Sequence, residues 1–96
     1  MTGMPGDPAP VADSVAAAAL SVPGVTRLHT GAFGEVATHL AGRKVGGVRL
    51  RDDVTEVHVS VSMGARVLEV ADSVRAVVMP LVTTPVNVFV EDITTS

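Results

Sequence analysis

The sequence predicts an α+β domain in which two helices cover one face of a small, mainly antiparallel sheet of three to four strands, in the order α-β-β-β-α-β. Apolar residues recur at helical spacing in two separate stretches, near residues 8–22 and 67–81. They alternate with polar residues at 48–51, 56–63 and 86–91, as in strands with one buried face. The 96 residues fit one domain, predicted over residues 8–93 between a mobile tail at 1–7 and a frayed tail at 94–96.

The first helix is predicted to run to about Val22. Asp7 is a favoured N-cap residue, and Pro8 suits the first helical position because no N–H is needed there. The apolar stripe that would face the sheet consists of Val11, Val15, Ala18, Ala19 and Val22. Pro23-Gly24 ends this helix.

The next segment combines a weak strand pattern with several glycines. Val25–Thr30 is predicted to be a short strand. The segment Gly31–Gly42 fits a helical turn over Glu35–Leu40 as well as a loop bounded by glycines. We therefore expect a mobile, partly ordered connection over Gly31–Gly42.

A hairpin is predicted around the turn Asp52-Asp53, because Asp favours turns. Before the turn, Val48 and Leu50 alternate with Arg49 and Arg51. After it, apolar and polar residues alternate through Val57, Val59, Val61 and Met63 on one face and Glu56, His58, Ser60 and Ser62 on the other. We expect the polar set to face solvent.

A second helix and a last strand are predicted after Gly64, which breaks the preceding strand. The apolar positions at helical spacing are Val67, Leu68, Ala71, Val74, Val78 and Leu81. Pro80 ends or kinks this helix late. In the last strand, Phe89 is predicted to point away from the core, on the same face as Asn87 and Glu91.

Composition excludes several classes of protein. Aromatic residues are 2% of the chain, so the core is predicted to consist of Val, Ala and Leu, and self-association would supplement so thin a core. The chain has no Cys, which excludes disulfides, thiolate metal sites and Cys nucleophiles. Met1–Pro10 has no basic residue, unlike a signal peptide, and the apolar run Val15–Val22 is too short to span a bilayer. We expect a cytoplasmic protein without direct membrane insertion.

The residues that could carry chemistry form no known catalytic or metal-binding motif. Glu56 and His58 share a strand face, and His29 lies on a neighbouring predicted strand, which leaves open a metal or small-molecule binder. However, the chain has no HxH, no HExxH and no Ser in a G-x-S-x-G elbow. The adjacent acids Asp52-Asp53 and Glu91-Asp92 lie in a turn and at a strand end, where nothing separates their pKa values. We expect no enzyme, no cofactor and no metal.

A candidate interaction surface is predicted instead. Its residues are Arg49, Arg51, Glu56, His58 and Phe89. The basic residues around the hairpin (Arg43, Lys44, Arg49 and Arg51) leave open an alternative function, a small nucleic-acid-binding module using the basic hairpin face. The net charge of −3 and the lack of Trp and Tyr argue against nucleic acid.

Four stretches together resemble the alkaline shock protein family of Gram-positive envelope-stress response proteins. They are VADSVAAAALSVPGV (11–25), GVRL (47–50), VHVSVSMGARVLEVADSVRAVV (57–78) and VNVFVEDI (86–93). The chain departs from the family pattern in two ways: Met1–Pro10 is too rich in Pro for the usual strand before the first helix, and Met63 stands where an aromatic residue is common. The resemblance implies a non-enzymatic protein, abundant under stress, that associates with itself as a homo-oligomer and with a small membrane-anchor protein at the cytoplasmic face.

Overall fold

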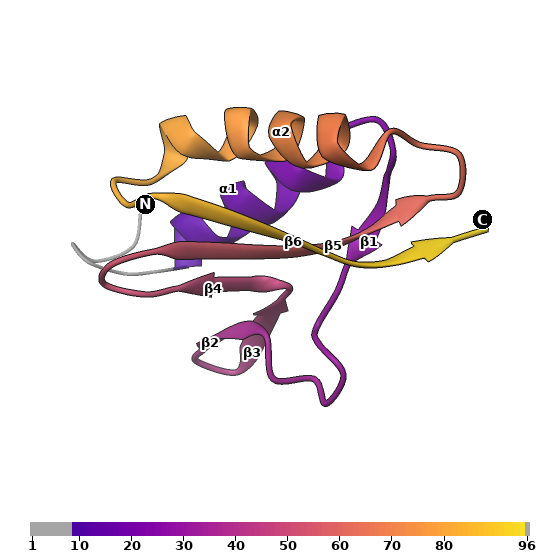
Figure 1. The fold of residues 1–96 in the computed structure, drawn as a ribbon. Coiled ribbons are helices and arrows are strands. Elements are labelled where there is room, and N and C mark those ends of the chain that lie inside the picture. Colours follow the sequence, from indigo (N-terminus) through magenta and orange to yellow (C-terminus); the bar gives the residue numbers. More distant parts are fainter. Residues whose placement is uncertain (1–8, 96) are drawn as a thin grey trace.

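The computed structural model describes residues 9–95, and it confirms the α+β fold with two helices over a mainly antiparallel sheet (Figure 1). The elements in chain order are α1 (Ala9–Leu20), β1 (Val25–Leu28), β2 (Ala37–Leu40), β3 (Arg43–Gly46), β4 (Val48–Leu50), β5 (Thr55–Ser62), α2 (Val67–Val78), the 3-10 helix η1 (Met79–Leu81) and β6 (Val86–Thr94). The helix cap predicted at Asp7-Pro8 and the tail at 1–7 lie outside the described residues.

Strand β5 is the centre of the sheet. The short strands β1 and β4 both pair antiparallel with it, β1 along its C-terminal half and β4 along its N-terminal half. The longer strand β6 pairs with β5 in parallel, and α2 makes the crossover between the two. Backbone groups of β5 alternate between the two sides: His58 N bonds Gly47 O on one side, and Thr55 N bonds Pro85 O on the other.

Both helices pack on the same face of this sheet (Figure 1). The core between the layers is built from small side chains, as the composition predicts, and Val57, Val59 and Val61 of β5 are completely buried in it. The other buried members are Ala12, Val15, Ala19, Val22, Val45, Val48, Val70, Val74, Val78 and Val86. The opposite face of the sheet carries no helix among the described residues (Figure 1).

A second, two-stranded sheet corrects the prediction for Gly31–Gly42. Instead of a mobile connection or a helical turn, Ala37–Leu40 forms strand β2, which pairs antiparallel with β3. The turn between them uses Gly42 at φ +77°, a conformation that favours glycine. Thr38 Oγ1 donates to Val48 O at 2.7 Å, so the hairpin lies along the outer edge of β4. Four-residue strands carry too little alternation to be recognised in the sequence.

Several boundaries differ from the predictions by a few residues. Helix α1 ends at Leu20, before the predicted end at Val22, and β1 ends at Leu28 and not at Thr30. Helix α2 ends at Val78, and Pro80 lies in the 3-10 helix that follows. Thr94, predicted to begin a frayed tail, is the last residue of β6, and its hydroxyl donates to Thr26 Oγ1 at 3.0 Å. Among the described residues, no helix has the length and the apolar composition needed to cross a membrane.

Candidate interaction surface

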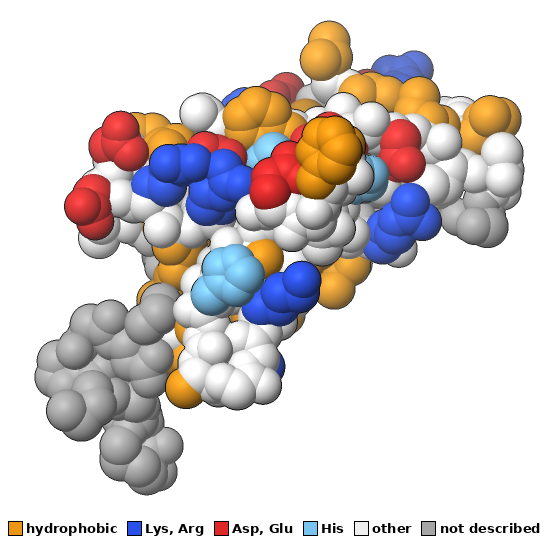
Figure 2. Space-filling view, turned by 90° about the horizontal axis from the view of Figure 1, so that it is seen from below, with side chains coloured by type: hydrophobic (Ala, Val, Ile, Leu, Met, Phe, Trp, Pro, Cys, Tyr) orange, Lys and Arg blue, Asp and Glu red, His pale blue; other side chains and the backbone are white. Residues whose placement is uncertain are grey.

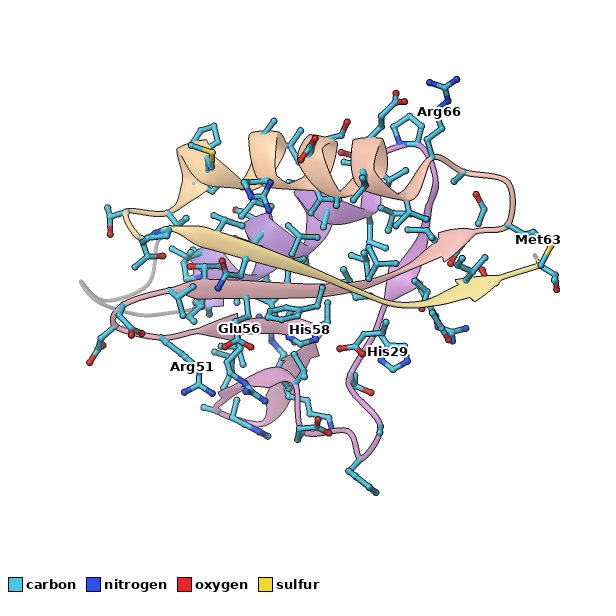
Figure 3. All side chains as sticks on the ribbon, viewed as in Figure 1. His29, Arg51, Glu56, His58, Met63 and Arg66 are labelled. Carbon is cyan, nitrogen blue, oxygen red and sulfur yellow. The ribbon has the colours of Figure 1, made fainter. Side chains whose placement is uncertain are left out.

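The residues predicted to form an interaction surface lie together on the helix-free face of the sheet. Figure 3 shows Arg51, Glu56 and His58 on this face. Cross-strand pairing places them there, because Arg49 of β4 is opposite Glu56 of β5, and His58 of β5 is opposite Phe89 of β6. Arg51 follows β4 directly. With one further residue, Glu91, these side chains make contact with one another, and we call them the sheet-face cluster: Arg49, Arg51, Glu56, His58, Phe89 and Glu91.

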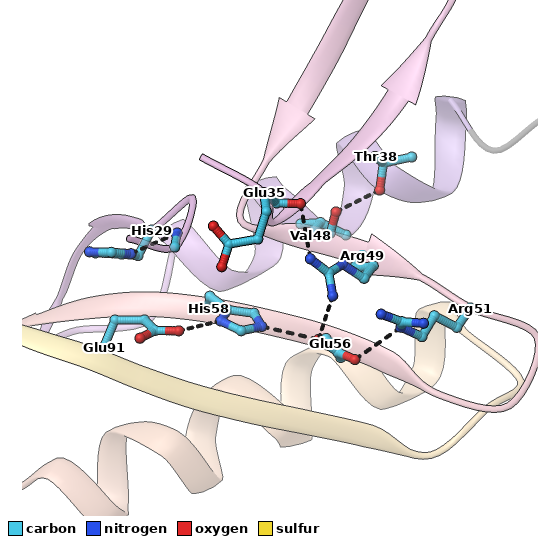
Figure 4. Close-up of polar contacts among 10 residues, drawn as sticks. His29, Glu35, Thr38, Val48, Arg49, Arg51, Glu56, His58 and Glu91 are labelled. Carbon is cyan, nitrogen blue, oxygen red and sulfur yellow. Dashed lines mark hydrogen bonds and ion pairs between the residues drawn. The ribbon is translucent and has the colours of Figure 1, made fainter. Parts of the chain in front are cut away.

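His58 is the centre of the sheet-face cluster (Figure 4). Its Nδ1 lies 2.5 Å from Glu91 Oε2, and its Nε2 lies 3.2 Å from Glu56 Oε1. The doubly protonated imidazolium donates to both carboxylates, whereas a neutral ring donates to one. The ring of Phe89 stacks on the imidazole, with 4.4 Å between centroids and 18° between planes. These three contacts fix the ring and leave the His58 residue 7% exposed.

Glu56 joins the histidine to the arginines. Arg51 Nε donates to Glu56 Oε2 at 3.1 Å, and Arg49 Nη1 lies 3.7 Å from Glu56 Oε1. Burial of the Glu56 carboxyl raises its pKa, but the hydrogen bond from His58 and the charges of both arginines outweigh this, so the pKa lies below the ordinary 4.5. Glu56 is therefore a carboxylate with several positive partners, held in its ionised form.

Two further contacts order the surface on either side of the sheet-face cluster. Arg49 Nη2 donates to the backbone carbonyl of Glu35 at 2.9 Å, which attaches the loop before β2 to the cluster. The pKa of Glu35 is lowered, because its own backbone N–H and that of Phe33 donate to the carboxylate. At the other end, Asp92 Oδ2 lies 3.5 Å from Arg27 Nη2. The helix-free face thus carries alternating charges along its length.

A β-bulge in β6 places two consecutive acids on the helix-free face, and the alternation in the sequence does not predict this bulge. Val90 is opposite Val59, but Asp92 is opposite Ser60, so Glu91 is an extra residue in β6. Strict alternation would direct Asp92 toward the helices. With the bulge, both acids contact groups on the helix-free face, Glu91 at His58 and Asp92 at Arg27. A bulge depends on pairing between strands and is therefore invisible in the alternation of one strand.

The predicted solvent exposure of β5 is wrong for two residues. His58 and Ser60 were expected to face solvent, but both are buried, Ser60 completely. The reason is that β5 is flanked on both sides by other strands, and side chains from those strands cover its polar face. Ser60 Oγ has no hydrogen-bond partner within the described part of the chain.

The histidine side chains considered for a metal or small-molecule site do not come together in the structure. The backbone N–H of His29 donates to the carbonyl of His58 at 2.8 Å, but the two rings have different partners. His29 Nδ1 accepts a hydrogen bond from Gly31 N at 2.9 Å, whereas both ring nitrogens of His58 contact carboxylates. His39 is exposed on the β2–β3 hairpin. Across residues 9–95, no group of three or more His, Asp or Glu side chains could hold a metal ion. The pairing of the His29 ring with the Glu56–His58 face therefore does not occur.

The basic residues do not form a free positive patch. Arg43 forms a two-pronged pair with Asp13 of α1 at 2.8 and 3.1 Å, whereas Arg49 and Arg51 contact Glu56. The described arginines each pair with a carboxylate: Arg27 with Asp92, Arg43 with Asp13, Arg49 and Arg51 with Glu56, Arg66 with Glu69, and Arg75 with Asp72. Figure 2, which looks onto the helix-free face, shows basic and acidic side chains adjacent to each other across the sheet.

No family model matches the chain, and neither does any curated protein or any solved structure. The function must therefore be argued from the surface itself. The sheet-face cluster offers charges that are already paired, one rigid aromatic ring and a long strand edge beside them.

Proposed function

We propose that this chain is a non-enzymatic structural or stress-response protein of the cytoplasm that acts through protein–protein contacts made by the sheet-face cluster. One observation carries the proposal: Phe89 is 41% exposed beside mutually neutralised charges and is held in place by its stack on His58. Rigid aromatic side chains surrounded by polar groups are typical anchors of protein interfaces. Few side chains would lose freedom when such a surface binds.

The contacts of His58 also argue for binding over catalysis. A general base needs a ring nitrogen that can reach a substrate proton, and a catalytic carboxyl needs a pKa suited to proton transfer. Both nitrogens of His58 face carboxylates, its ring is covered by Phe89, and the pKa of Glu56 is lowered. His58, Phe89 and Glu56 therefore hold the side chains of the sheet-face cluster in one conformation.

The family resemblance supports two further parts of the proposal. It implies self-association, and it implies a small membrane-anchor protein as a partner that would place the chain at the inner face of the cell envelope. A nucleic-acid-binding function is the alternative from the sequence. The pairing of Arg49 and Arg51 with Glu56 argues against it, because a phosphate would have to displace an existing carboxylate.

Co-purification from the native host under envelope stress tests the proposal. Phe89→Ala removes the exposed ring of the cluster, and Phe33→Ala is a matched control because Phe33 is 93% exposed in the loop after β1. We expect the wild type and Phe33→Ala to retain a co-purifying protein partner, and Phe89→Ala to lose it.

Two results would overturn the proposed function. The first is a wild-type chain that is a monomer at every concentration in light scattering and that retains no partner protein. The second is firm retention on a polyanion column at about 50 mM salt that disappears as salt rises, since this behaviour indicates phosphate binding. Equal loss of partner in both Phe variants would instead exclude the sheet-face cluster as the contact surface.

A further inference from the structure

The outer edge of β6 is a long row of backbone groups beside the sheet-face cluster. Thr55 N donates to Pro85 O, and the parallel register continues through Glu56 opposite Asn87 and His58 opposite Phe89. In a parallel ladder only alternate residues of a strand bond to a given neighbour. The backbone groups of Asn87 and Phe89 therefore face β5. The N–H and C=O groups that point outward belong to Val86, Val88 and Val90.

This edge differs from the opposite edge of the sheet. Within residues 9–95, β6 pairs with β5 alone over nine residues, whereas β1 and β4 are four and three residues long. The β2–β3 hairpin lies along β4, through Thr38 on Val48 O. On β6, Arg75 Nε donates to the first outward carbonyl, that of Val86, at 3.3 Å. The outward groups of Val88 and Val90 follow it.

Edge strands are commonly protected by Lys, Pro or a bulge. Strand β6 contains no Lys, no Arg and no Pro, and its bulge and acids come only after Val90. Its central part, residues 87–90, is therefore suited to accept another strand. The question is which strand fits.

We propose that the occupant is β6 of a second copy of this chain, antiparallel and related by a twofold axis at Phe89. Val88 of one copy would then exchange both backbone hydrogen bonds with Val90 of the other, since these groups point outward in both. This inference rests on the proposed function and names a partner for the same surface. A twofold pairing also closes the edge and does not continue into a filament.

The side chains of β6 are complementary to themselves in this register. Phe89 meets Phe89 of the second copy at a pair without hydrogen bonds, where Cα atoms lie about 4.5 Å apart and side chains are closest. Glu91 lies opposite Asn87, so no like charges are paired. A parallel second copy would instead place Glu91 beside Glu91. The His58 stack also orders Phe89 before association, which lowers the entropy lost on pairing.

Cysteine cross-linking tests the pairing directly, because the natural chain has no Cys. In the proposed register, the two copies of Phe89→Cys bring their Cα atoms to about 4.5 Å, within the range of a disulfide. Phe33→Cys is the control, since residue 33 is exposed and distant from β6 in the sequence. We expect mild oxidation to link Phe89→Cys at least about tenfold faster than Phe33→Cys, since pairing raises the effective concentration.

A second variant separates pairing from folding. Val88→Pro removes an outward N–H that makes no bond to β5, so the internal ladder keeps its hydrogen bonds. We expect wild type to show twice its 9.8 kDa mass in light scattering and Val88→Pro to show the monomer mass with a folded circular-dichroism spectrum.

If Val88→Pro unfolds, the relative cross-linking rates still decide the question. Equal rates at positions 89 and 33, or a wild type that is strictly monomeric, would overturn the pairing. A monomeric chain that still binds another protein through Phe89 would overturn only this inference and leave the proposed function standing. Fast cross-linking at position 89 without any partner from the host would leave the pairing standing and remove the anchor protein from the proposal.

Discussion

Replacing His58 with Ala would remove the central contact of the sheet-face cluster. The ring makes hydrogen bonds to Glu56 and Glu91 and stacks on Phe89. A hydrogen bond to a charged group contributes about 1.5–3 kcal/mol, and we take the lower value for both because Glu91 is partly exposed. The stack adds about 0.5–1.5 kcal/mol. We therefore expect the free energy of unfolding to fall by about 3.5–4.5 kcal/mol.

This loss is large for a chain of 96 residues, whose total stability is about 5–14 kcal/mol. Urea unfolding followed by circular dichroism is the suitable assay, because the chain has no Trp or Tyr for fluorescence. The midpoint is expected to fall by roughly 2 M or more. The control is His39→Ala, an exposed histidine whose loss is expected to change stability by less than about 0.5 kcal/mol.

A double-mutant cycle of His58→Ala and Phe89→Ala isolates the stack. We expect a coupling free energy of about 0.5–1.5 kcal/mol, because the two rings are in direct contact. A loss below about 1 kcal/mol for His58→Ala would refute the reasoning, since water would then replace the network at little cost. Zero coupling would refute the role assigned to the stack.

Three further predictions concern pH, a glycine and the core. The Glu56 carboxylate stabilises the fold above its ordinary pKa of 4.5, and this contribution is lost as pH falls through its lowered pKa. The Tm of Glu56→Gln is therefore expected to fall less steeply than that of the wild type below pH 4.5. Equal slopes of Tm against pH in the two proteins would contradict this. Gly47→Ala is expected to lower the free energy of unfolding in urea by about 2–4 kcal/mol, because φ is +80° and a Cβ would lie 2.6 Å from Leu28 Cβ. Gly42→Ala, at φ +77° with nothing within 4 Å, should lower it by about 1–2 kcal/mol, because only the backbone strain remains. Equal losses would show that the backbone at Gly47 shifts freely. Val59→Ala is expected to lower the free energy of unfolding by about 2–3 kcal/mol, because the side chain is completely buried. The control is Val77→Ala, since Val77 is 38% exposed. An equal loss in both variants would contradict the core assignment.

Local sequence patterns were sufficient for both helices, for every strand except β2 and β3, and for two contacts of the cluster. The Asp52-Asp53 turn and the alternation on either side of it specify the β4–β5 hairpin. Because a hairpin's turn also sets its register, the pairing of Arg49 and Arg51 with Glu56 follows from residues only a few positions apart. The helical repeat, Gly64 and Pro80 likewise placed α2 between two strands.

The tertiary structure decided how distant strands meet. The contact of His58 with Phe89 and Glu91 depends on the parallel register of β6 against β5 and on the bulge at Glu91. No turn links these strands directly, so their register is set by how α2 packs on the sheet, a property of the whole core. The burial of His58 and Ser60 has the same origin, because strands on both sides cover them. The sequence alone determined which strand residues share a face up to the bulge at Glu91, and the packing determined the face of Asp92 and which residues touch.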